Sequence, residues 1–523
     1  MTREKNILWI MADQLRWDYL SCYGHPTLQT PVMDGIAARG VRFDNAYVNA
    51  TICGPSRMCY YTGRHMWTHG SSWNDVPLRV GEPTLGDHLR PLGYRTALVG
   101  KTHVSADIEG MKRLGMDRES LEGVLAAECG FEPYWRDDGI HPDKFATMDI
   151  EYNKFLADHG FESPNPWHFA ANAGVDENRE ALSGWHMRNA ARPTAIPDEL
   201  SETAYTTNKA MDFIREAGDQ PWCLHVSYIK PHWPYIVQAP YHDMYSAADV
   251  IPVNRSEAEK DNAHPIMKGH MGYVESRSFS ETQVRNTVVP VYMGLIRQLD
   301  DHLGRLMAFL EAEGRIEDTV IVISSDHGDY LGDHWLGEKE LFHDESAKVP
   351  LIIYDPAPEA DGTRGTASAE IVQAIDLAAT FADIAGGQGL GHILEGKSLR
   401  PILHGTGRGH DYIVSELDYS HRHVARDMGL DWNKCRAWMV LTSDWKYVYW
   451  EGMRPQLFDR MNDPKELTDL GDDPAHRDIC DRHRDLLFDW FRDRRLTVTF
   501  GEKDVANRRQ GGPEQVGVMI GYW

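Results

Sequence analysis

The chain has 523 residues, which is long enough for a large buried core and for more than one folding unit. Its hydrophobic content of 42% is ordinary for a globular protein, and its formal net charge is −25. A chain this acidic lacks the basic surface that nucleic acids and anionic membranes require, so we expect neither partner.

Strand and helix patterns alternate along the first 400 residues. Apolar runs predict strands at 6–12, 41–48, 95–100, 222–229, 319–324 and 349–354. Helices are predicted at 30–40, where Thr30-Pro31 is a start signal and Gly40 a stop, at 84–92, and at 291–313, where leucines recur at helical spacing. This alternation predicts an α/β fold, with a large, mostly parallel sheet and helices on both faces.

Two regions depart from this alternation. Residues 105–200 are polar, rich in Trp, Gly and Pro and weakly periodic, which favours a lid-like excursion. After residue 405, short strands at 437–443 and 445–449 precede a helix at about 475–494. We therefore predict a catalytic α/β domain over 1–405, a smaller C-terminal α+β subdomain over 406–500, and a tail over 501–523. The apolar end of that tail, Met519–Trp523, favours docking onto a neighbouring subunit of a homo-oligomer.

The compartment is predicted from what the chain lacks. The apolar stretch at 7–12 is too short for a signal peptide, and no window approaches the roughly 18 apolar residues that span a bilayer. The seven cysteines are scattered and odd in number and contain no C-x-x-C pair, which favours a reducing environment over a disulfide framework. We interpret the protein as cytoplasmic.

Reactive side chains follow five of the predicted strands. In an open α/β sheet, ligands bind beyond the carboxyl ends of the strands, so these residues are expected to form one site. In chain order they are Asp13 and Gln14, Cys53 and Arg57, Lys101 and His103, Lys230 and His232, and Asp326 and His327.

A divalent metal is the expected cofactor. Asp13, Gln14, Asp326 and His327 would supply two carboxylates, an amide oxygen and an imidazole. Calcium and magnesium prefer all-oxygen ligands, whereas an imidazole moves the preference toward manganese or zinc. We favour Mn²⁺, with Ca²⁺ as the alternative.

The segment Cys53-Gly54-Pro55-Ser56-Arg57 is the most specific feature. Pro55 can open a helix that runs to about residue 61 and stops at Gly63, which puts Arg57 one turn from Cys53 on the same face. Free amides at the start of this helix favour an anion. The alternative reading is a buried or metal-binding thiol.

With these residues assembled, the chain resembles the sulfatase branch of the alkaline phosphatase superfamily. The C-x-P-x-R motif of sulfatases matches Cys53, Pro55 and Arg57, and Lys339 stands where these enzymes place a substrate-contacting lysine. Further matches, in the family's order, are Gly100-Lys101-Thr102-His103, Pro231-His232-Trp233-Pro234, Asp326-His327-Gly328 and the C-terminal Leu457-Phe458-Asp459. The resemblance implies an alkaline-phosphatase-like fold. It also implies that a separate maturation enzyme converts Cys53 to formylglycine, which joins the metal ligands.

The match to typical sulfatases is incomplete. They carry Asp where this chain has Gln14, and Asn where it has His327. This metal set instead resembles that of phosphonate monoester hydrolases, and choline sulfatases share the Asp-Gln pair. Asn74 resembles a substrate-contacting residue of the phosphonate enzymes, but these have Tyr and Thr where this chain keeps the sulfatase pair Lys101 and His103.

The resemblance implies an arylsulfatase with side activity on phosphonate monoesters and phosphodiesters, acting on small anionic esters. Arg57, Lys101 and Lys339 would neutralise the transferred group, His232 or Lys339 would protonate the leaving oxygen, and His103 would act as base. The alternatives are a phosphonate monoester hydrolase or phosphodiesterase, a choline-sulfatase-like enzyme, a non-enzymatic binder of sulfated ligands, and a metal-only phosphodiesterase with an unmodified cysteine. Four histidines in polar segments are predicted to be surface residues: His264, His270, His421 and His423.

Overall fold

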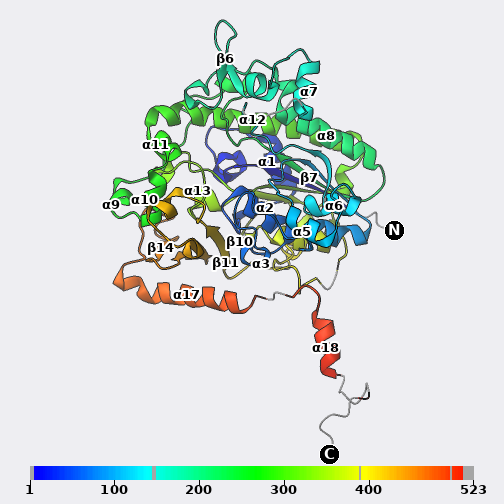
Figure 1. The fold of residues 1–523 in the computed structure, drawn as a ribbon, viewed down its shortest axis with the longest axis vertical. Helices are drawn as coiled ribbons and strands as arrows, with labels where there is room; N and C mark the ends of the chain where they lie inside the picture. The colour runs from blue at the N-terminus through cyan, green and yellow to red at the C-terminus, as the bar shows by residue number, and fades with distance from the viewer. Residues whose placement is uncertain (1–4, 144–148, 388–389, 495–496, 511–516, 518–523) are drawn as a thin grey trace, which may run out of the picture.

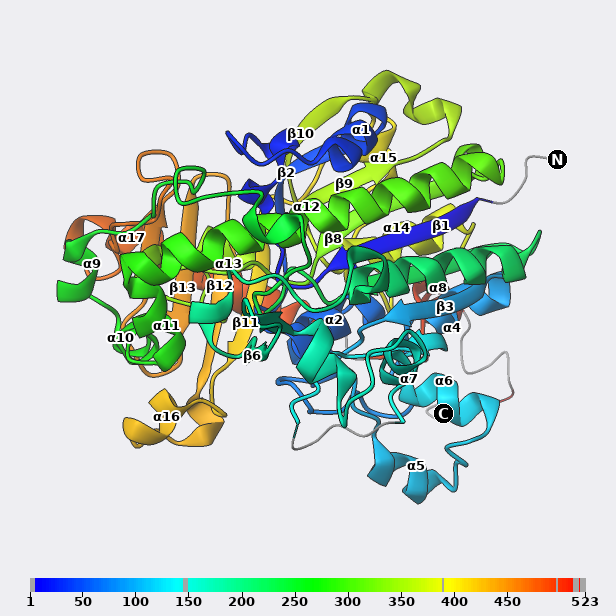
Figure 2. The same ribbon diagram turned by 90° about the horizontal axis from the view of Figure 1, so that it is seen from above.

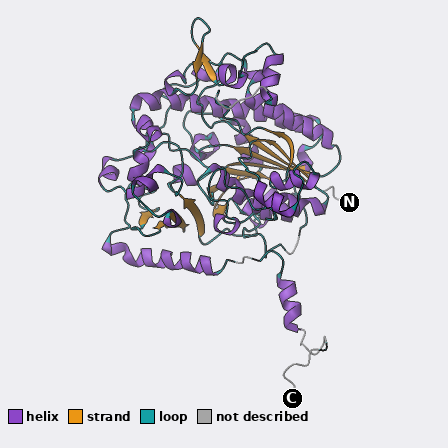
Figure 3. Cartoon of the chain, in the orientation of Figure 1, coloured by secondary structure: helices purple, strands orange, loops and turns teal. Residues whose placement is uncertain are grey.

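A computed structural model of the chain describes residues 5–143, 149–387, 390–494, 497–510 and 517. An eight-stranded sheet in the order β10-β2-β9-β8-β1-β7-β3-β4 forms its centre (Figures 1 and 3). In chain order the strands are β1 (Asn6–Ala12), β2 (Val41–Tyr47), β3 (Arg95–Gly100), β4 (Glu132–Arg136), β7 (Trp222–Tyr228), β8 (Thr319–Ser325), β9 (Leu351–Tyr354) and β10 (Thr366–Gln373).

The sheet is mostly parallel, as predicted. Strands β8, β1, β7, β3 and β4 form a continuous parallel block. Strand β9 runs antiparallel to both of its neighbours, β8 and β2, and β10 then pairs with β2 in parallel. Apolar content alone does not report direction, so the reversal of β9 was not predictable from its sequence, and neither β4 nor β10 was predicted.

Strand β1 shows why the central strands read as unbroken apolar runs. Every one of its seven residues is buried, because successive side chains point to opposite, equally covered faces. On one face, Leu8, Ile10 and Ala12 pack into a hydrophobic cluster that we call the first cluster. On the opposite face, Ile7, Trp9 and Met11 pack into a second cluster.

Helices cover both faces. Helices α1 (Pro31–Arg39), α8 (Glu202–Ala217) and α12 (Thr282–Ala312) share the first cluster, and α8 and α12 lie together on one side of the sheet (Figure 2). Helices α2 (Cys53–Thr62), α4 (Leu85–Leu89) and α14 (Asp376–Ile384) cover the other side. This arrangement confirms the predicted fold class.

The region 105–200 is more than a lid. It contains α5 (Ile108–Leu114), α6 (Leu121–Ala127), α7 (Glu151–Asp158) and a small hairpin of β5 (Ala173–Val175) and β6 (Ala181–Ser183). It also contributes β4, the edge strand of the main sheet. Trp135 lies on β4, is buried and packs edge-on against Tyr205, so it fills the core and cannot stack on a substrate.

The C-terminal region forms a four-stranded antiparallel sheet of β11 (Ile413–Asp418), β12 (Arg436–Leu441), β13 (Trp445–Trp450) and β14 (Gln456–Asp459), covered by α17 (Arg477–Arg492). Its other face shares a hydrophobic cluster with Tyr47 and Ile52 of the main domain. His264 and His270 are buried against this region, His264 stacked on Trp450, so their prediction as surface residues is wrong.

Beyond α17, helix α18 (Glu502–Gln510) projects from the body of the protein (Figure 1). The predicted docking segment, Met519–Trp523, lies outside the described residues. Among the described residues no helix combines the length and apolarity of a membrane span. All seven cysteines are free thiols.

Candidate active site

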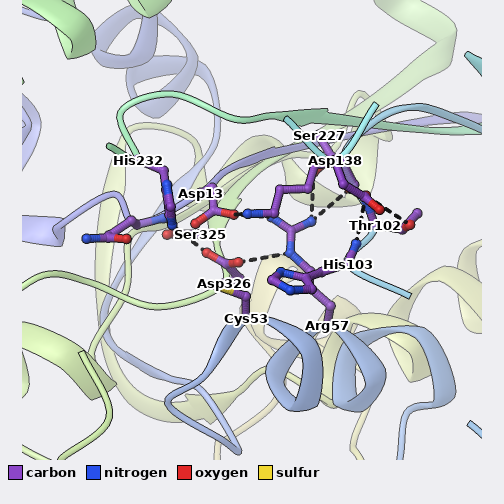
Figure 4. Close-up of polar contacts among 12 residues, drawn as sticks. Asp13, Cys53, Arg57, Thr102, His103, Asp138, Ser227, His232, Ser325 and Asp326 are labelled. Carbon is purple, nitrogen blue, oxygen red and sulfur yellow. Dashed lines mark hydrogen bonds and ion pairs between the residues drawn. The ribbon is translucent and has the colours of Figure 1, made fainter. Parts of the chain in front are cut away.

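The predicted residues converge at one edge of the sheet. Strands β1, β3, β7 and β8 are mutually aligned and parallel, so their carboxyl ends meet. Figure 4 shows Asp13, Cys53, Arg57, His103, His232 and Asp326 grouped there.

Cys53 is the first residue of α2, whose ten residues are all buried. Ile52, at the N-cap position, is extended and offers no side-chain cap. Gly63, after the last residue, adopts the left-handed conformation with φ 65° and closes the helix. The start and stop predicted from Pro55 and Gly63 are therefore correct to within two residues. The thiol sits at the positive end of the helix dipole.

Four side chains form what we call the metal-binding cluster: Asp13, Cys53, Asp326 and His327. Each offers one ligand atom, and these atoms all lie within 4.8 Å of one another. His327 Nδ1 lies 2.9 Å from the carbonyl oxygen of Gly328, so Nδ1 carries the proton and Nε2 is left to face the cluster, 3.0 Å from Cys53 Sγ.

The cluster fits a divalent cation. Asp13 Oδ1 is buried without a hydrogen-bond donor, and His327 Nε2 lies 3.8 Å from a carboxylate oxygen of both Asp13 and Asp326. A buried carboxylate oxygen without a donor is costly, and a cation would satisfy it. Carboxylates and an imidazole are common ligands of divalent metal ions in proteins.

Gln14 lies beside this cluster in the left-handed region, with φ 65°. Its backbone N–H donates to Asp326 Oδ1 at 3.1 Å, and its side-chain Oε1 accepts from Lys339 Nζ at 3.3 Å. The predicted ligand set is therefore brought together in space.

Arg57 is placed differently from the expectation that it contacts the substrate. Its Nε donates to Asp326 Oδ2 at 2.9 Å and its Nη2 to Asp13 Oδ2 at 3.1 Å. Its Nη1 donates to the Lys101 carbonyl and to Ser227 Oγ. At least four of the five guanidinium donors are used within the protein (Figure 4). Arg57 therefore holds the carboxylates of Asp13 and Asp326 in place.

Two lysines bring positive charge to the cluster. Lys101 Nζ forms a buried ion pair with Asp13 Oδ2 at 2.6 Å. Burial raises the pKa of the Cys53 thiol, but nearby positive charge, that of Lys339 first, outweighs burial and holds that pKa well below its ordinary value. The site therefore stabilises an anion at position 53.

His103 is held by a residue that the sequence did not reveal. Its backbone is strained, with φ 55°, and its N–H donates to Asp138 Oδ1 at 2.9 Å, as does the N–H of Thr102 at 2.8 Å (Figure 4). Asp138 follows β4 and pairs with Arg136 at 2.6 Å. Only the pairing of β4 with β3 brings Asp138 here, and no local pattern around residue 138 could have indicated it.

His232 is a hydrogen-bond acceptor in this geometry. Its Nδ1 lies 2.8 Å from the Trp233 carbonyl oxygen, and its Nε2 lies 3.4 Å from Lys339 Nζ. Burial lowers the pKa of His232 to about 3, and Lys101 and Lys339 also lower it. The imidazole is therefore uncharged at neutral pH, and its Nε2 faces the ammonium of Lys339.

Lys230 anchors the loop that carries His232. Lys230 is buried, and its Nζ donates to the carbonyl oxygen of Pro234 at 2.9 Å and to Asn172 Oδ1 at 3.1 Å. Lys230 is therefore a support for this loop.

Asn74 lies against the first turn of α2. Its Oδ1 accepts from the N–H of Gly54 at 2.8 Å. A Cβ at position 54 would lie 2.9 Å from that oxygen, so the contact requires glycine. The amide oxygen of Asn74 is thus committed to the helix, and its NH₂ is the group that remains for a ligand.

Comparison with known proteins agrees with this site. A family model described as Sulfatase matches residues 5–387, and one described as N-sulphoglucosamine sulphohydrolase, C-terminal, matches residues 332–491. The multifunctional alkaline phosphatase superfamily protein PehA of Trinickia caryophylli is 30% identical over 94% of this chain and 95% of its own. An arylsulfatase of Clostridium perfringens is 27% identical over 95% and 96%. The phosphonate monoester hydrolase of Silicibacter pomeroyi superposes with a TM-score of 0.82 at 26% identity, covering 95% of this chain and 97% of that one.

Proposed function

Because this chain belongs to the sulfatase family and is a sulfuric ester hydrolase, we propose that it cleaves aryl sulfate monoesters with a formylglycine nucleophile formed from Cys53. The observation that carries the proposal is the position of Cys53. Its sulfur atom lies among the carboxylates and imidazole of the metal-binding cluster, at a helix N-terminus, with Lys101 and Lys339 near it.

The proposed cofactor is one Mn²⁺ ion held by the metal-binding cluster and Gln14. When bound, a divalent cation would supply positive charge to the sulfate oxygens and make the nucleophile more acidic. Arg57 would keep Asp13 and Asp326 in place for it.

In the proposed first half-reaction, one hydroxyl of hydrated formylglycine 53 loses its proton to solvent, because the surrounding positive charge favours the alkoxide. The alkoxide attacks sulfur in line as the bond between sulfur and the ester oxygen breaks. Lys101 and Lys339 stabilise the charge on the non-bridging oxygens. Lys339 gives a proton to the departing alcohol, because its ammonium is the charged group beside His232, and His232 Nε2 accepts from that ammonium and orients it.

In the second half-reaction, His103 removes the proton of the remaining hydroxyl. The carbon–oxygen bond to the sulfate group then breaks, which releases sulfate and restores the aldehyde. An unmodified serine or cysteine would lack this route and would need water to attack a crowded anionic ester.

Side activity toward phosphonate monoesters and phosphodiesters is part of the proposal. The neutral amide of Gln14 and the imidazole of His327 support it, as does the likeness to phosphonate monoester hydrolases. Lys101, paired with Asp13, and His103 favour sulfate as the preferred group.

The compartment, the oligomeric state and the maturation of the protein are also proposed. We propose a cytoplasmic homo-oligomer whose Cys53 is converted by a separate maturation enzyme. The six other cysteines are free thiols, which is consistent with a reducing compartment.

The test is a comparison of kcat/KM for an aryl sulfate and an aryl phosphonate monoester with the same leaving group. A sulfate preference of a hundredfold or more (about 3 kcal/mol in transition-state binding) is expected. A preference for the phosphonate would reverse the ranking. Cys53→Ala should abolish turnover, whereas a non-enzymatic binder would keep its function. Insensitivity to aldehyde-trapping reagents would contradict the formylglycine mechanism.

A further inference from the structure

The side chain of Gln14 is held in one orientation by groups that lie away from the metal-binding cluster. Its Nε2 donates to Asp329 Oδ2 at 2.5 Å and lies 3.5 Å from Tyr235 Oη. Its Oε1 is turned the other way, toward Lys339 Nζ. Lys339 Nζ also lies 3.4 Å from His232 Nε2, so Oε1 is on the side of the proposed active site.

Asp329 is fully buried and accepts donors on both of its oxygens. Oδ1 accepts from the N–H of Leu331 at 3.0 Å, and Oδ2 accepts from Tyr235 Oη at 2.5 Å as well as from Gln14. A carboxylate suits this position because both of its oxygens are acceptors. An amide would turn its NH₂ toward a donor in either orientation.

We propose that Asp329 is a positioning residue that keeps the carbonyl oxygen of Gln14 directed at the bound metal. An amide has nearly the same shape after half a turn, so without Asp329 the side chain could present its NH₂, which cannot bind a cation. The pair also restricts position 14. A carboxylate there would bring two buried anionic oxygens together where an N–H now donates, and at such a distance like charges repel strongly.

This pairing has a consequence for charge. Typical sulfatases, which this chain resembles, carry Asp where this chain has Gln14. Here residue 14 is a neutral amide, and a buried carboxylate, that of Asp329, accepts a hydrogen bond from its NH₂.

The inference rests on the metal-dependent hydrolysis proposed above, and substrate-free metal binding tests it separately. The measurement is the dissociation constant of Mn²⁺ for the metal-stripped full-length protein, by calorimetric titration, in wild type, Asp329→Asn, Gln14→Glu and the double variant. Tyr235→Phe is the matched control, because it removes the other side-chain donor to Asp329 Oδ2 and leaves the carboxylate in place.

In Asp329→Asn, the rigid N–H of Leu331 should hold the oxygen of the asparagine amide, so the asparagine NH₂ faces Gln14. The Gln14 amide should then flip, which turns its own oxygen toward position 329 and its NH₂ toward the metal. Mn²⁺ binding should weaken about 10- to 100-fold, as for other partners that orient metal ligands. Gln14→Glu alone should weaken it about tenfold. The double variant should return to within about threefold of wild type, because the asparagine NH₂ now donates to the glutamate. Tyr235→Phe should change it less than about threefold.

Two results would overturn the positioning role of Asp329 and leave the proposed function standing. One is additive losses in the double variant, and the other is Mn²⁺ binding by Asp329→Asn within threefold of wild type. If Asp329→Asn does not fold, as judged by circular dichroism, Gln14→Glu decides, because an added carboxylate ligand would tighten Mn²⁺ binding if Asp329 played no part. A wild-type protein that binds no Mn²⁺ would overturn the metal-dependent function as well.

Discussion

Replacing Asp138 with alanine should impair His103, the proposed base, without changing His103 itself. Asp138 Oδ1 accepts the N–H groups of Thr102 and His103 at 2.8 and 2.9 Å. A hydrogen bond to a charged acceptor contributes about 1.5–3 kcal/mol, so the two bonds together contribute about 3–6 kcal/mol. His103 also sits at φ 55°, a conformation that costs a non-glycine residue about 1–2 kcal/mol and that these bonds offset.

Without Asp138 the backbone at His103 should relax and displace the imidazole. A displacement of about 1 Å lowers a rate on the order of 100-fold, so kcat/KM for an aryl sulfate should fall by about that factor. Mn²⁺ binding should stay unchanged, because His103 lies outside the metal-binding cluster.

Glu128→Ala is the matched control. Arg136 pairs with both Glu128, at 2.7 Å, and Asp138, at 2.6 Å, so either substitution removes one of its partners. Only Asp138→Ala removes the acceptor of the two backbone amides. Equal losses of kcat/KM in the two variants, or a loss of less than about threefold in Asp138→Ala, would refute the reasoning.

Three further predictions concern stability. Arg57→Met should lower the free energy of unfolding in urea by about 3–5 kcal/mol, since it leaves Asp326 buried without its cation and Asp13 with Lys101 alone; a loss below about 1 kcal/mol would contradict this. Burial raises the pKa of Glu416 from an ordinary 4.5 to about 8, so ionisation is disfavoured in the folded state. Its contribution to stability should fall as pH rises through that window, by at most about 5 kcal/mol, and Glu416→Gln should abolish this dependence in urea titrations at pH 5 and pH 8. Chelation should lower the thermal midpoint, with Mn²⁺ at 100 times its dissociation constant restoring about 2.7 kcal/mol; an unchanged midpoint would count against a bound metal.

Local patterns were enough to predict most elements that position the site. The apolar run of β1 and the Gly63 stop of α2 are properties of adjacent residues, and periodicity and turn chemistry report them directly. Convergence of Asp13 and Asp326 followed as well, because parallel strands end at one edge of a sheet.

What only the tertiary structure decided is which side chains pair across the chain. Gln14 and Asp329 are 315 positions apart, and His103 and Asp138 are 35 apart and follow different strands. The reversal of β9 and the four acceptors around Arg57 are of the same kind. Sequence periodicity records whether a residue is buried, because burial recurs at the period of a helix or strand. It does not record the partner, because a partner is chosen when distant segments pack together.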